Sequence, residues 1–207
     1  RANGGPMTKN PCPTGSLQAL FQNYEAVHIC DNPKLGFTAI IAIHDTTLGP
    51  SLGGCRRMSY PTLWDAFVDV ARLAEGMSYK AALAGLPLGG GKCVMIPRKK
   101  SKRLRSAQYR ALGEFIESLG GTHISAEDVG TFVPDILEMA KKTKYVCGKM
   151  NGHPYHGDPS YYTAIGVYYG MLGTIRAVEG NSATLAGRSV YIEGIGKVGF
   201  PLMQELH

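Results

Sequence analysis

Short apolar runs rich in β-branched residues alternate along this chain with longer stretches whose apolar residues recur at helical spacing. Residues 37–43 and 93–96 are runs of the first kind and predict largely buried strands. Residues 62–79 and 106–119 are stretches of the second kind, and each predicts an amphipathic helix. Strands that alternate with helices favour an α/β fold.

Capping signals place the ends of some of these elements. Thr62 and Asp65 have the spacing of a capping box, so the first long helix is expected to begin there. Pro134 suits the first position of another helix, which is expected to continue through Lys141. A brief strand is predicted at residues 123–124, between the helical patterns at 106–119 and 134–141.

Two regions separate near residue 150. Residues 148–159 are rich in Gly, Pro, Asn, Asp and His, which is typical of a loop or hinge. Beyond it the sequence predicts a helix over residues 160–179 and a strand over residues 189–193. We therefore expect one domain over residues 7–150 and the beginning of another over residues 151–207; the six residues before Met7 resemble a vector-encoded leader.

Glycine is the compositional outlier. The chain has 27 glycines in 207 residues, against a usual share of ~7%. They are clustered rather than spread in a low-complexity tract, so we expect the backbone to be approached closely at several points. The clusters are Gly53-Gly54, Gly89-Gly90-Gly91, Gly120-Gly121 and Gly194/Gly196/Gly199.

The last glycine cluster forms a complete G-x-G-x-x-G over residues 194–199. It follows a predicted strand and precedes apolar residues at helical spacing, which is the context of a dinucleotide-binding turn. In such a turn the glycines let the backbone reach a pyrophosphate at a helix N-terminus. A tight βα turn without a ligand is the alternative. The acidic residue that would read the ribose, about 20 positions further on, would fall beyond His207, so NAD and NADP are not distinguished.

The second candidate for a functional motif is Gly91-Lys92. A phosphate-binding P-loop is excluded, because Leu86 and Cys93 stand where that motif requires glycine and serine or threonine. A lysine in apolar, glycine-rich surroundings can serve as a general base when burial and a neighbouring cation favour the neutral amine. A surface lysine after a loop is the alternative interpretation.

The basic residues are concentrated in one place. The chain has 22 Lys and Arg against 16 Asp and Glu, a net charge of +6, and six of the cations lie between Arg98 and Arg105. We interpret this run as a solvated helix start, with a nucleic-acid-binding or localisation segment as the alternative.

Other composition signals argue against several kinds of protein. Five cysteines without a CxxC pair favour reduced thiols in a cytoplasm-like compartment. The histidines at 153 and 156 have no evident third ligand, so no metal site is expected. An apolar stretch of the ~18 residues that a membrane span requires is also absent from the sequence.

Several motifs together resemble the Glu/Leu/Phe/Val amino-acid dehydrogenase superfamily, and its leucine/phenylalanine/valine branch in particular. They occur in order and with compatible spacing over most of the chain. The motifs are LGPSLGGCR at residues 48–56, GMSYK at 76–80, GLPLGGGK at 85–92, SAEDVG at 125–130, and Asp158-Pro159-Ser160 with Thr163-Ala164.

The resemblance implies roles for individual residues. Lys80 would bind the α-carboxylate of the substrate, and Lys92 would be the catalytic lysine, with Lys80 as its neighbouring cation. Asp128 would shuttle protons and contact the substrate amino group. Gly53 and Gly54 resemble a turn whose backbone approaches the substrate.

The resemblance also bears on specificity and cofactor. Leu52 stands where glutamate-acting relatives carry a lysine for the side-chain carboxylate; a desolvated leucine cannot pair a second carboxylate, so an apolar substrate is expected. Ala126 would line the same pocket, and Cys55 and Cys93 replace small polar residues, with an effect on packing or thiol sensitivity. Thr163 resembles a contact of the nicotinamide carboxamide. The pyrophosphate turn would comprise Gly194, Ile195, Gly196, Lys197, Val198 and Gly199.

The expected fold is therefore α/β, with an N-terminal substrate-binding and oligomerisation domain followed by the start of a Rossmann domain in a chain that we expect to be truncated. The expected activity is NAD-dependent, reversible oxidative deamination of an apolar L-amino acid, of leucine, valine or phenylalanine type, to the 2-oxo acid and ammonia. We expect a cytoplasmic homo-oligomer that binds neither nucleic acid nor membrane. A truncated, non-catalytic oligomerisation or binding domain of the same fold is the alternative.

Overall fold

The computed structural model describes residues 16–99, 101–148 and 158–207. The chain divides into two compact units, and the boundary in the sequence falls between Cys147 and Gly148. The first unit is built on a five-stranded sheet. In the second unit the described residues form two helices joined by a segment without strands.

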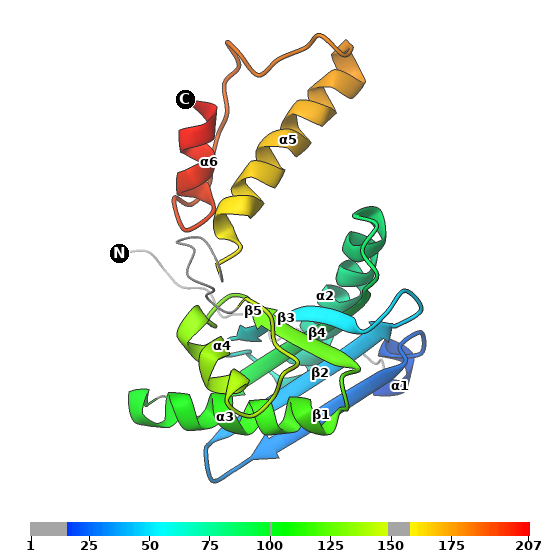
Figure 1. Ribbon diagram of the computed structural model, residues 1–207, viewed down its shortest axis with the longest axis vertical. Coiled ribbons are helices and arrows are strands. Elements are labelled where there is room, and N and C mark those ends of the chain that lie inside the picture. Colours follow the sequence, from blue (N-terminus) through cyan, green and yellow to red (C-terminus); the bar gives the residue numbers. More distant parts are fainter. Residues whose placement is uncertain (1–15, 100, 149–157) are drawn as a thin grey trace, which may run out of the picture. The chain divides into compact units, whose positions relative to one another are not determined.

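The sheet of the first unit has the order β1-β2-β4-β3-β5 (Figure 1). The pairs β1/β2 and β2/β4 are antiparallel, whereas β3 runs parallel to both β4 and β5. This mixed sheet with its helices confirms the predicted α/β class. The strands are β1 (Ala26–Asn32), β2 (Phe37–Asp45), β3 (Ser51–Arg57), β4 (Gly89–Pro97) and β5 (His123–Glu127).

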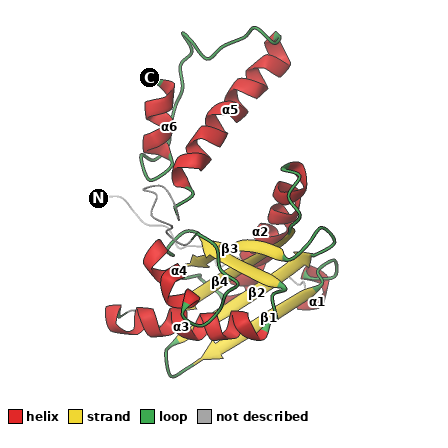
Figure 2. Cartoon of the chain, viewed as in Figure 1, coloured by secondary structure: helices red, strands yellow, loops and turns green. Residues whose placement is uncertain are grey.

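Helices cover both faces of the sheet (Figure 2). Successive residues of a strand point to opposite faces, so Ile40 of β2 joins the core cluster of α2 while Ile41 joins that of α3 and α4. Burial on both faces explains why β2 and β4 are almost continuous apolar runs. The helices of this unit are α1 (Leu17–Leu20), α2 (Leu63–Leu83), α3 (Lys102–Ser118) and α4 (Val133–Ala140).

The start of α2 confirms the predicted capping box. The Asp65 amide donates to Thr62 Oγ1 at 3.1 Å, and the Thr62 amide donates to Asp65 Oδ2 at 2.9 Å. The predicted end near residues 76–79 is wrong, because α2 continues to Leu83 and stops in a Schellman motif. Gly85 has φ +63°, its amide bonds to the Ala82 carbonyl, and the next amide bonds to that of Ala81.

Two of the four glycine clusters lie in strands. Gly53 and Gly54, expected in a turn, lie inside β3, and β4 begins at Gly89 rather than at Cys93. Glycine is depleted in most strands, so these segments carry no strand signal. Here the missing side chains let strands approach closely: a Cβ on Gly53 would overlap the carbonyl oxygen of Gly91, and one on Gly54 would overlap that of Glu127.

Other elements differ from expectation in simpler ways. The sequence did not predict β1, in which exposed and half-buried residues alternate along a sheet edge. Helices α3 and α4 agree with the patterns at 106–119 and 134–141, although α3 begins four residues earlier, at Lys102, whereas the short α1 was not predicted.

In the second unit, α5 (Ser160–Glu179) confirms the predicted helix, and α6 (Gly199–Leu206) follows the glycine motif. The predicted strand at 189–193 is wrong for this chain: these residues form no strand, and Tyr191 is 89% exposed. A strand needs a hydrogen-bonding partner, and residues 158–207 supply none. Residues 149–157, which include most of the loop predicted at 148–159 and the histidines at 153 and 156, lie outside the described residues.

The close approach at Gly53 predicts a loss of stability when a side chain is added. We expect Gly53→Ala to lower the free energy of unfolding by about 3 kcal/mol, because the new Cβ meets backbone that cannot move independently. Urea unfolding of purified protein measures this change.

The matched control is Gly76→Ala in the interior of α2, where an added Cβ has no neighbour within 4 Å. That variant should be more stable than wild type by about 0.5–1 kcal/mol. Equal effects of the two substitutions would contradict the close packing of β3 against β4.

Candidate active site

Polar side chains from three parallel strands gather on the sheet face that α2 partly covers. Strand alternation places Arg56 of β3 and Lys92 of β4 on this face, and Asp128 directly follows β5. α2 packs mainly on β2 and β4 and only lightly on β3. The part of the face formed by β3 and β5 is therefore the part left available for a ligand within this unit.

One carboxylate oxygen of Asp128 contacts two positively charged side chains. Lys92 Nζ lies 3.1 Å from Asp128 Oδ2, and Arg56 Nε donates to the same oxygen at 2.9 Å. The Lys92 side chain is 7% exposed, and those of Arg56 and Asp128 are each 21% exposed. This is a mostly desolvated ion triplet, in which each charge depends on the others.

The guanidinium of Arg56 is anchored on its other side by α2. Its Nη1 donates to both carboxylate oxygens of Asp69, at 3.1 and 2.9 Å. The hydroxyl of Tyr60, in the segment before α2, donates to Asp69 Oδ2 at 2.6 Å. A continuous polar chain thus runs from Tyr60 through Asp69 and Arg56 to Asp128 and Lys92.

The electrostatics of this chain favour the charged forms. Burial by itself would raise the pKa of Asp128, but Lys92 and Arg56 outweigh it and hold that pKa below its usual value. Burial would lower the pKa of Arg56, but Asp128 and Asp69 raise it overall. Burial and the hydrogen bond to Asp69 raise the pKa of the Tyr60 hydroxyl.

Glycines make room for these side chains. A Cβ on Gly54 would lie 2.8 Å from Asp128 Cβ, and one on Gly90 would overlap Ser78 of α2. Gly53 abuts the backbone of Gly91 and Lys92 in the neighbouring strand. The glycine clusters of β3 and β4 therefore set how near Lys92 and Asp128 can come to each other.

Two predicted pocket residues lie on the same face. Leu52 is half-buried and lies opposite Gly90 of β4 on one side and Ile124 of β5 on the other. Ala126 pairs with Gly54, and alternation aligns it with Asp128. The structure thus brings an apolar surface next to the Lys92–Asp128 pair.

Lys80 is placed differently from Lys92. It lies in the last turn of α2 and is exposed, two residues after Ser78, which packs against Gly90 at the start of β4. Among the described residues the structure gives Lys80 no ion pair. Its role as the neighbouring cation of Lys92 stays a prediction.

The glycine motif of the second unit forms a tight turn before α6. Gly194 has φ +89°, and a Cβ on Gly199 would overlap the Gly194 carbonyl oxygen, so the turn is tight. Gly196 faces open space, and α6 begins at Gly199 without a side-chain cap. Open backbone at a helix N-terminus fits an anionic group.

Lys197 and Thr163 complete the set of expected cofactor residues. Lys197 Nζ forms an ion pair with Asp158 Oδ2 at 2.6 Å, and Thr163 Oγ1 donates to the Pro159 carbonyl at 2.9 Å. Ile195, within the turn, is exposed, and Val198 directly precedes α6. These positions are compatible with cofactor binding, which remains a prediction.

The cysteines that replace small polar residues lie away from this face. Cys55 and Cys93 are fully buried in the core beneath α3, and they are direct partners across β3 and β4. The hydrogen bond to Cys55 and burial raise the pKa of the Cys93 thiol. Buried thiols of this kind are poorly reactive, so of the two expected effects the structure favours packing over thiol sensitivity.

His123 lies on the same side of the sheet as these thiols. Its Nδ1 is 3.0 Å from Ser51 Oγ, and burial lowers the pKa of its imidazole to about 3. On the other side of the sheet, Nδ1 of His44 lies 2.8 Å from Ser78 Oγ. Among the described residues, no group of three His, Cys, Asp or Glu side chains could hold a metal ion.

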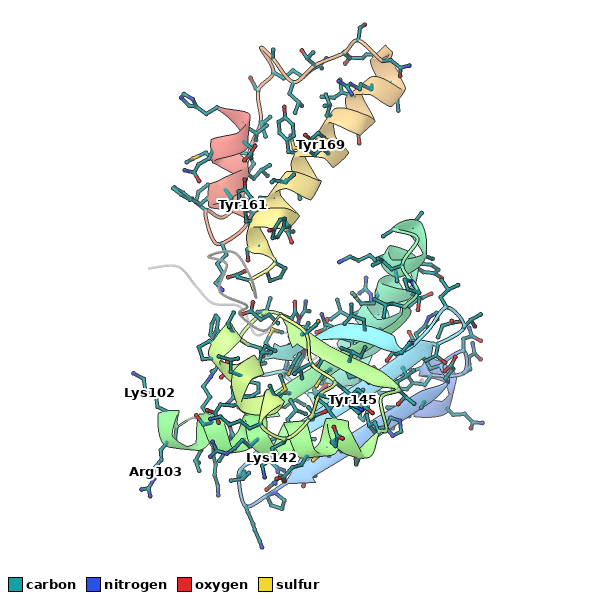
Figure 3. The ribbon with its side chains drawn as sticks, viewed as in Figure 1. Lys102, Arg103, Lys142, Tyr145, Tyr161 and Tyr169 are labelled. Atoms are coloured by element: carbon teal, nitrogen blue, oxygen red, sulfur yellow. The ribbon has the colours of Figure 1, made fainter. Side chains whose placement is uncertain are left out.

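The basic residues between Arg98 and Arg105 contact different acidic residues or extend into solvent. Arg98 forms an ion pair with Asp31 at 2.8 Å, and Arg105 pairs with Asp135. Lys102 and Arg103, labelled in Figure 3, extend from the first turn of α3 away from the sheet. This agrees with the interpretation of the run as a solvated helix start.

Sequence reasoning assigned no role to Arg56, Asp69 or Tyr60. Arg56 is the last residue of the motif at residues 48–56. The spacing was a signal for its role, because Arg56 lies two residues after Gly54 in β3 and so on the same face of the sheet. Asp69 is a charged residue between the buried residues Ala66 and Val70 of α2. A carboxylate beside the buried stripe of a helix indicates a partner.

Comparisons with known proteins show to which family the chain belongs. A family model described as "Glu/Leu/Phe/Val dehydrogenase, dimerisation domain" matches residues 25–145. Leucine dehydrogenase of Geobacillus stearothermophilus is 46% identical over 187 residues, which are 89% of this chain and 50% of that protein. Phenylalanine dehydrogenase of Bacillus thermotolerans is 43% identical over 191 residues, which are 92% of this chain and 50% of that protein.

Solved structures give the same result. The crystal structure of L-tryptophan dehydrogenase from Nostoc punctiforme matches with a TM-score of 0.66 and 36% identity, covering 88% of this chain and 50% of that one. The chain therefore belongs to the Glu/Leu/Phe/Val dehydrogenase family. It spans about half the length of the curated relatives it matches.

Proposed function

We propose that the protein carrying this sequence catalyses the NAD-dependent, reversible oxidative deamination of an apolar L-amino acid to its 2-oxo acid and ammonia. The observation that carries the proposal is the desolvated Lys92–Asp128 pair on a glycine-lined sheet face. The names of the leucine and phenylalanine dehydrogenase relatives, at 42–46% identity, support the reaction class.

In the proposed reaction, Lys80 binds the α-carboxylate and so orients Cα. A bound NAD⁺, held by residues 194–199 and Thr163, would supply the acceptor for the hydride that leaves Cα. Lys92 then takes a proton from the water that attacks the resulting iminium, and Asp128 transfers protons as the carbinolamine collapses to 2-oxo acid and ammonia. One amino acid, one NAD⁺ and one water thus give one 2-oxo acid, one ammonium ion, one NADH and one proton.

The ion pair places a condition on this mechanism. While the Lys92 ammonium donates to Asp128 Oδ2, it has no lone pair with which to accept a proton from water. Lys92 must therefore lose its extra proton to solvent before it can activate water. The neutral amine no longer balances the charge of the carboxylate, so Asp128 exchanges Lys92 for the amino group of the substrate. The low pKa of Asp128 supports this exchange, because an ionised carboxylate attracts the substrate ammonium group.

Substrate specificity follows from the apolar part of the face. Leu52 and Ala126 offer no partner to a side-chain carboxylate, whereas they can pack against an aliphatic or aromatic side chain. Burying an unpaired carboxylate costs several kcal/mol. We therefore propose substrates of the leucine, valine or phenylalanine type and not glutamate.

For the cofactor, we propose that residues 194–199 and the N-terminus of α6 hold the pyrophosphate of NAD, with Thr163 at the nicotinamide carboxamide. The tight Gly194–Gly199 turn and the open backbone at Gly196 support this assignment. Lys197, within the turn, pairs with Asp158 and so links the turn to the segment just before α5.

We also propose that the protein forms a homo-oligomer in the cytoplasm. The free thiols of Cys30, Cys55, Cys93 and Cys147 favour a reducing compartment. The word "dimerisation" in the description of the matching family model supports the assembly. No helix in the described parts of the chain combines the length and apolar character that crossing a membrane requires.

The two edges of the sheet differ in a way that favours β1 as the contact between copies. The outer edge of β5 is partly covered, since Ser125 bonds to the backbone of Tyr145 and Cys147. β1 pairs only with β2 in the described sheet, and Ile29 on it is 53% exposed. An open edge with an exposed apolar residue invites pairing.

If β1 is the contact between copies of the chain, Ile29→Lys should weaken assembly, because a charged residue on an exposed strand opposes pairing with a second strand. Sedimentation velocity should show the wild-type protein as an oligomer and the variant as smaller species. Lys34→Glu in the turn after β1 is a control for the change of charge. A variant as large as wild type would contradict the role of β1.

The activity is tested by following NADH at 340 nm with Leu, Val, Phe, Trp and Glu as substrates. We expect NADH from the apolar amino acids but not from Glu, and a loss of at least 10²-fold in kcat for Lys92→Ala, which removes the general base. Wild-type turnover in that variant would contradict the assignment of Lys92.

Thermal unfolding of the 207-residue chain distinguishes the alternative function. If leucine raises the Tm but no amino acid supports NADH formation, the chain is a non-catalytic binding domain. The absence of both effects would reject an amino-acid site on this sheet face.

A further inference from the structure

The exchange required of Asp128 leaves open what holds its carboxylate when Lys92 leaves. Lys92 accounts for one of the two contacts to Oδ2, and the other comes from Arg56 Nε at 2.9 Å. A half-buried carboxylate that loses its only cation would gain a proton or turn toward solvent. The second cation prevents both, and its role depends on the function proposed above.

Arg56 is fixed independently of Asp128 and of Lys92. Its backbone is held in β3 opposite Val94 of β4, and its Nη1 is bonded to both oxygens of Asp69. Tyr60 closes the arrangement by donating to Asp69 Oδ2. None of these contacts requires Lys92, so the guanidinium stays in place when the lysine moves.

The shape of the guanidinium suits this position. Its Nε and Nη1 donors diverge toward two different carboxylates, which a lysine ammonium on a flexible stem cannot hold in the same fixed directions. Both cations reach Oδ2, so Oδ1 is the oxygen of Asp128 that a substrate group can engage. Asp69 and Tyr60 act on Asp128 only through Arg56.

We propose that Arg56 is the positioning residue of this site: braced by Asp69 and Tyr60, it holds Asp128 through Oδ2 and presents Oδ1 to the substrate amino group whether or not Lys92 is in contact. Lys92 is then the exchangeable partner of the carboxylate, and Arg56 the permanent one.

The sign of the electrostatic effect follows from this arrangement. With Lys92 removed, Arg56 remains, and the pKa of Asp128 should stay at or below the ordinary value of about 3.9. With both cations removed, burial alone acts and the pKa should rise above that value. Removing Arg56 alone should raise it by roughly one unit.

The experiment is a ¹³C NMR titration of the Asp128 carboxyl in the 207-residue chain. The variants are Lys92→Met, Arg56→Gln and the double variant. We expect an Asp128 pKa at or below about 4 in Lys92→Met, and one above it in the double variant. A pKa well above 4 in Lys92→Met, or no change on adding Arg56→Gln, would overturn the proposal.

Arg57→Gln is the matched control. Arg57 is the next residue of β3, and its guanidinium bonds to Gln108 and lies over the Tyr109 ring on the opposite face. This variant loses the same charge one residue away, and the Asp128 pKa should stay within about 0.2 of wild type. An equal shift in both arginine variants would show a general charge effect and reject positioning by Arg56.

The readout does not depend on turnover. Lys92→Met leaves Arg56 and its contacts with Asp69 and Tyr60 untouched, and urea unfolding of the arginine variants checks that their Asp128 pKa is that of folded protein. The NADH assay fails or succeeds separately, so loss of the proposed function and loss of the positioning role give different results. A chain that positions Asp128 but makes no NADH supports the second proposal and not the first.

Discussion

A single carboxylate oxygen, Asp128 Oδ2, accepts both Lys92 and Arg56, and the local architecture is organised around that contact. Three parallel strands must meet closely for their side chains to converge on one atom. β3 and β4 achieve this with glycines at positions where any Cβ would strike neighbouring backbone or α2. Removing three charges from water is costly, and the geometry compensates through direct pairing and hydrogen bonds.

The sequence predicted those parts of the fold that depend on local patterns. The apolar runs of β2 and β4, the capping box of α2 and the extent of α5 each follow from neighbouring residues. β3 was missed because its glycines lower strand propensity and become favourable only beside the carbonyls of other strands. The strand expected at 189–193 failed for the related reason that pairing partners decide whether a strand forms.

Some residues of the candidate site could be predicted from the sequence, whereas others could be found only in the structure. Lys92, Asp128, Leu52 and Ala126 came from motifs whose residues resemble a known family, and strand alternation brings them to one face. Asp69 and Tyr60 act through Arg56, whose contact with Asp128 spans 72 residues of sequence, and neither belongs to a motif of its own. Their contribution is visible only when α2 is docked on the sheet.

The measurement that tests this account most directly is a double-mutant cycle between Lys92 and Asp128, with Lys92→Met, Asp128→Asn and the double variant unfolded in urea at neutral pH. A desolvated ion pair predicts a coupling free energy of about 1–3 kcal/mol between the two positions. A coupling smaller than about 0.3 kcal/mol would mean that the two side chains do not interact in solution. That result would contradict the site on which the proposed chemistry rests.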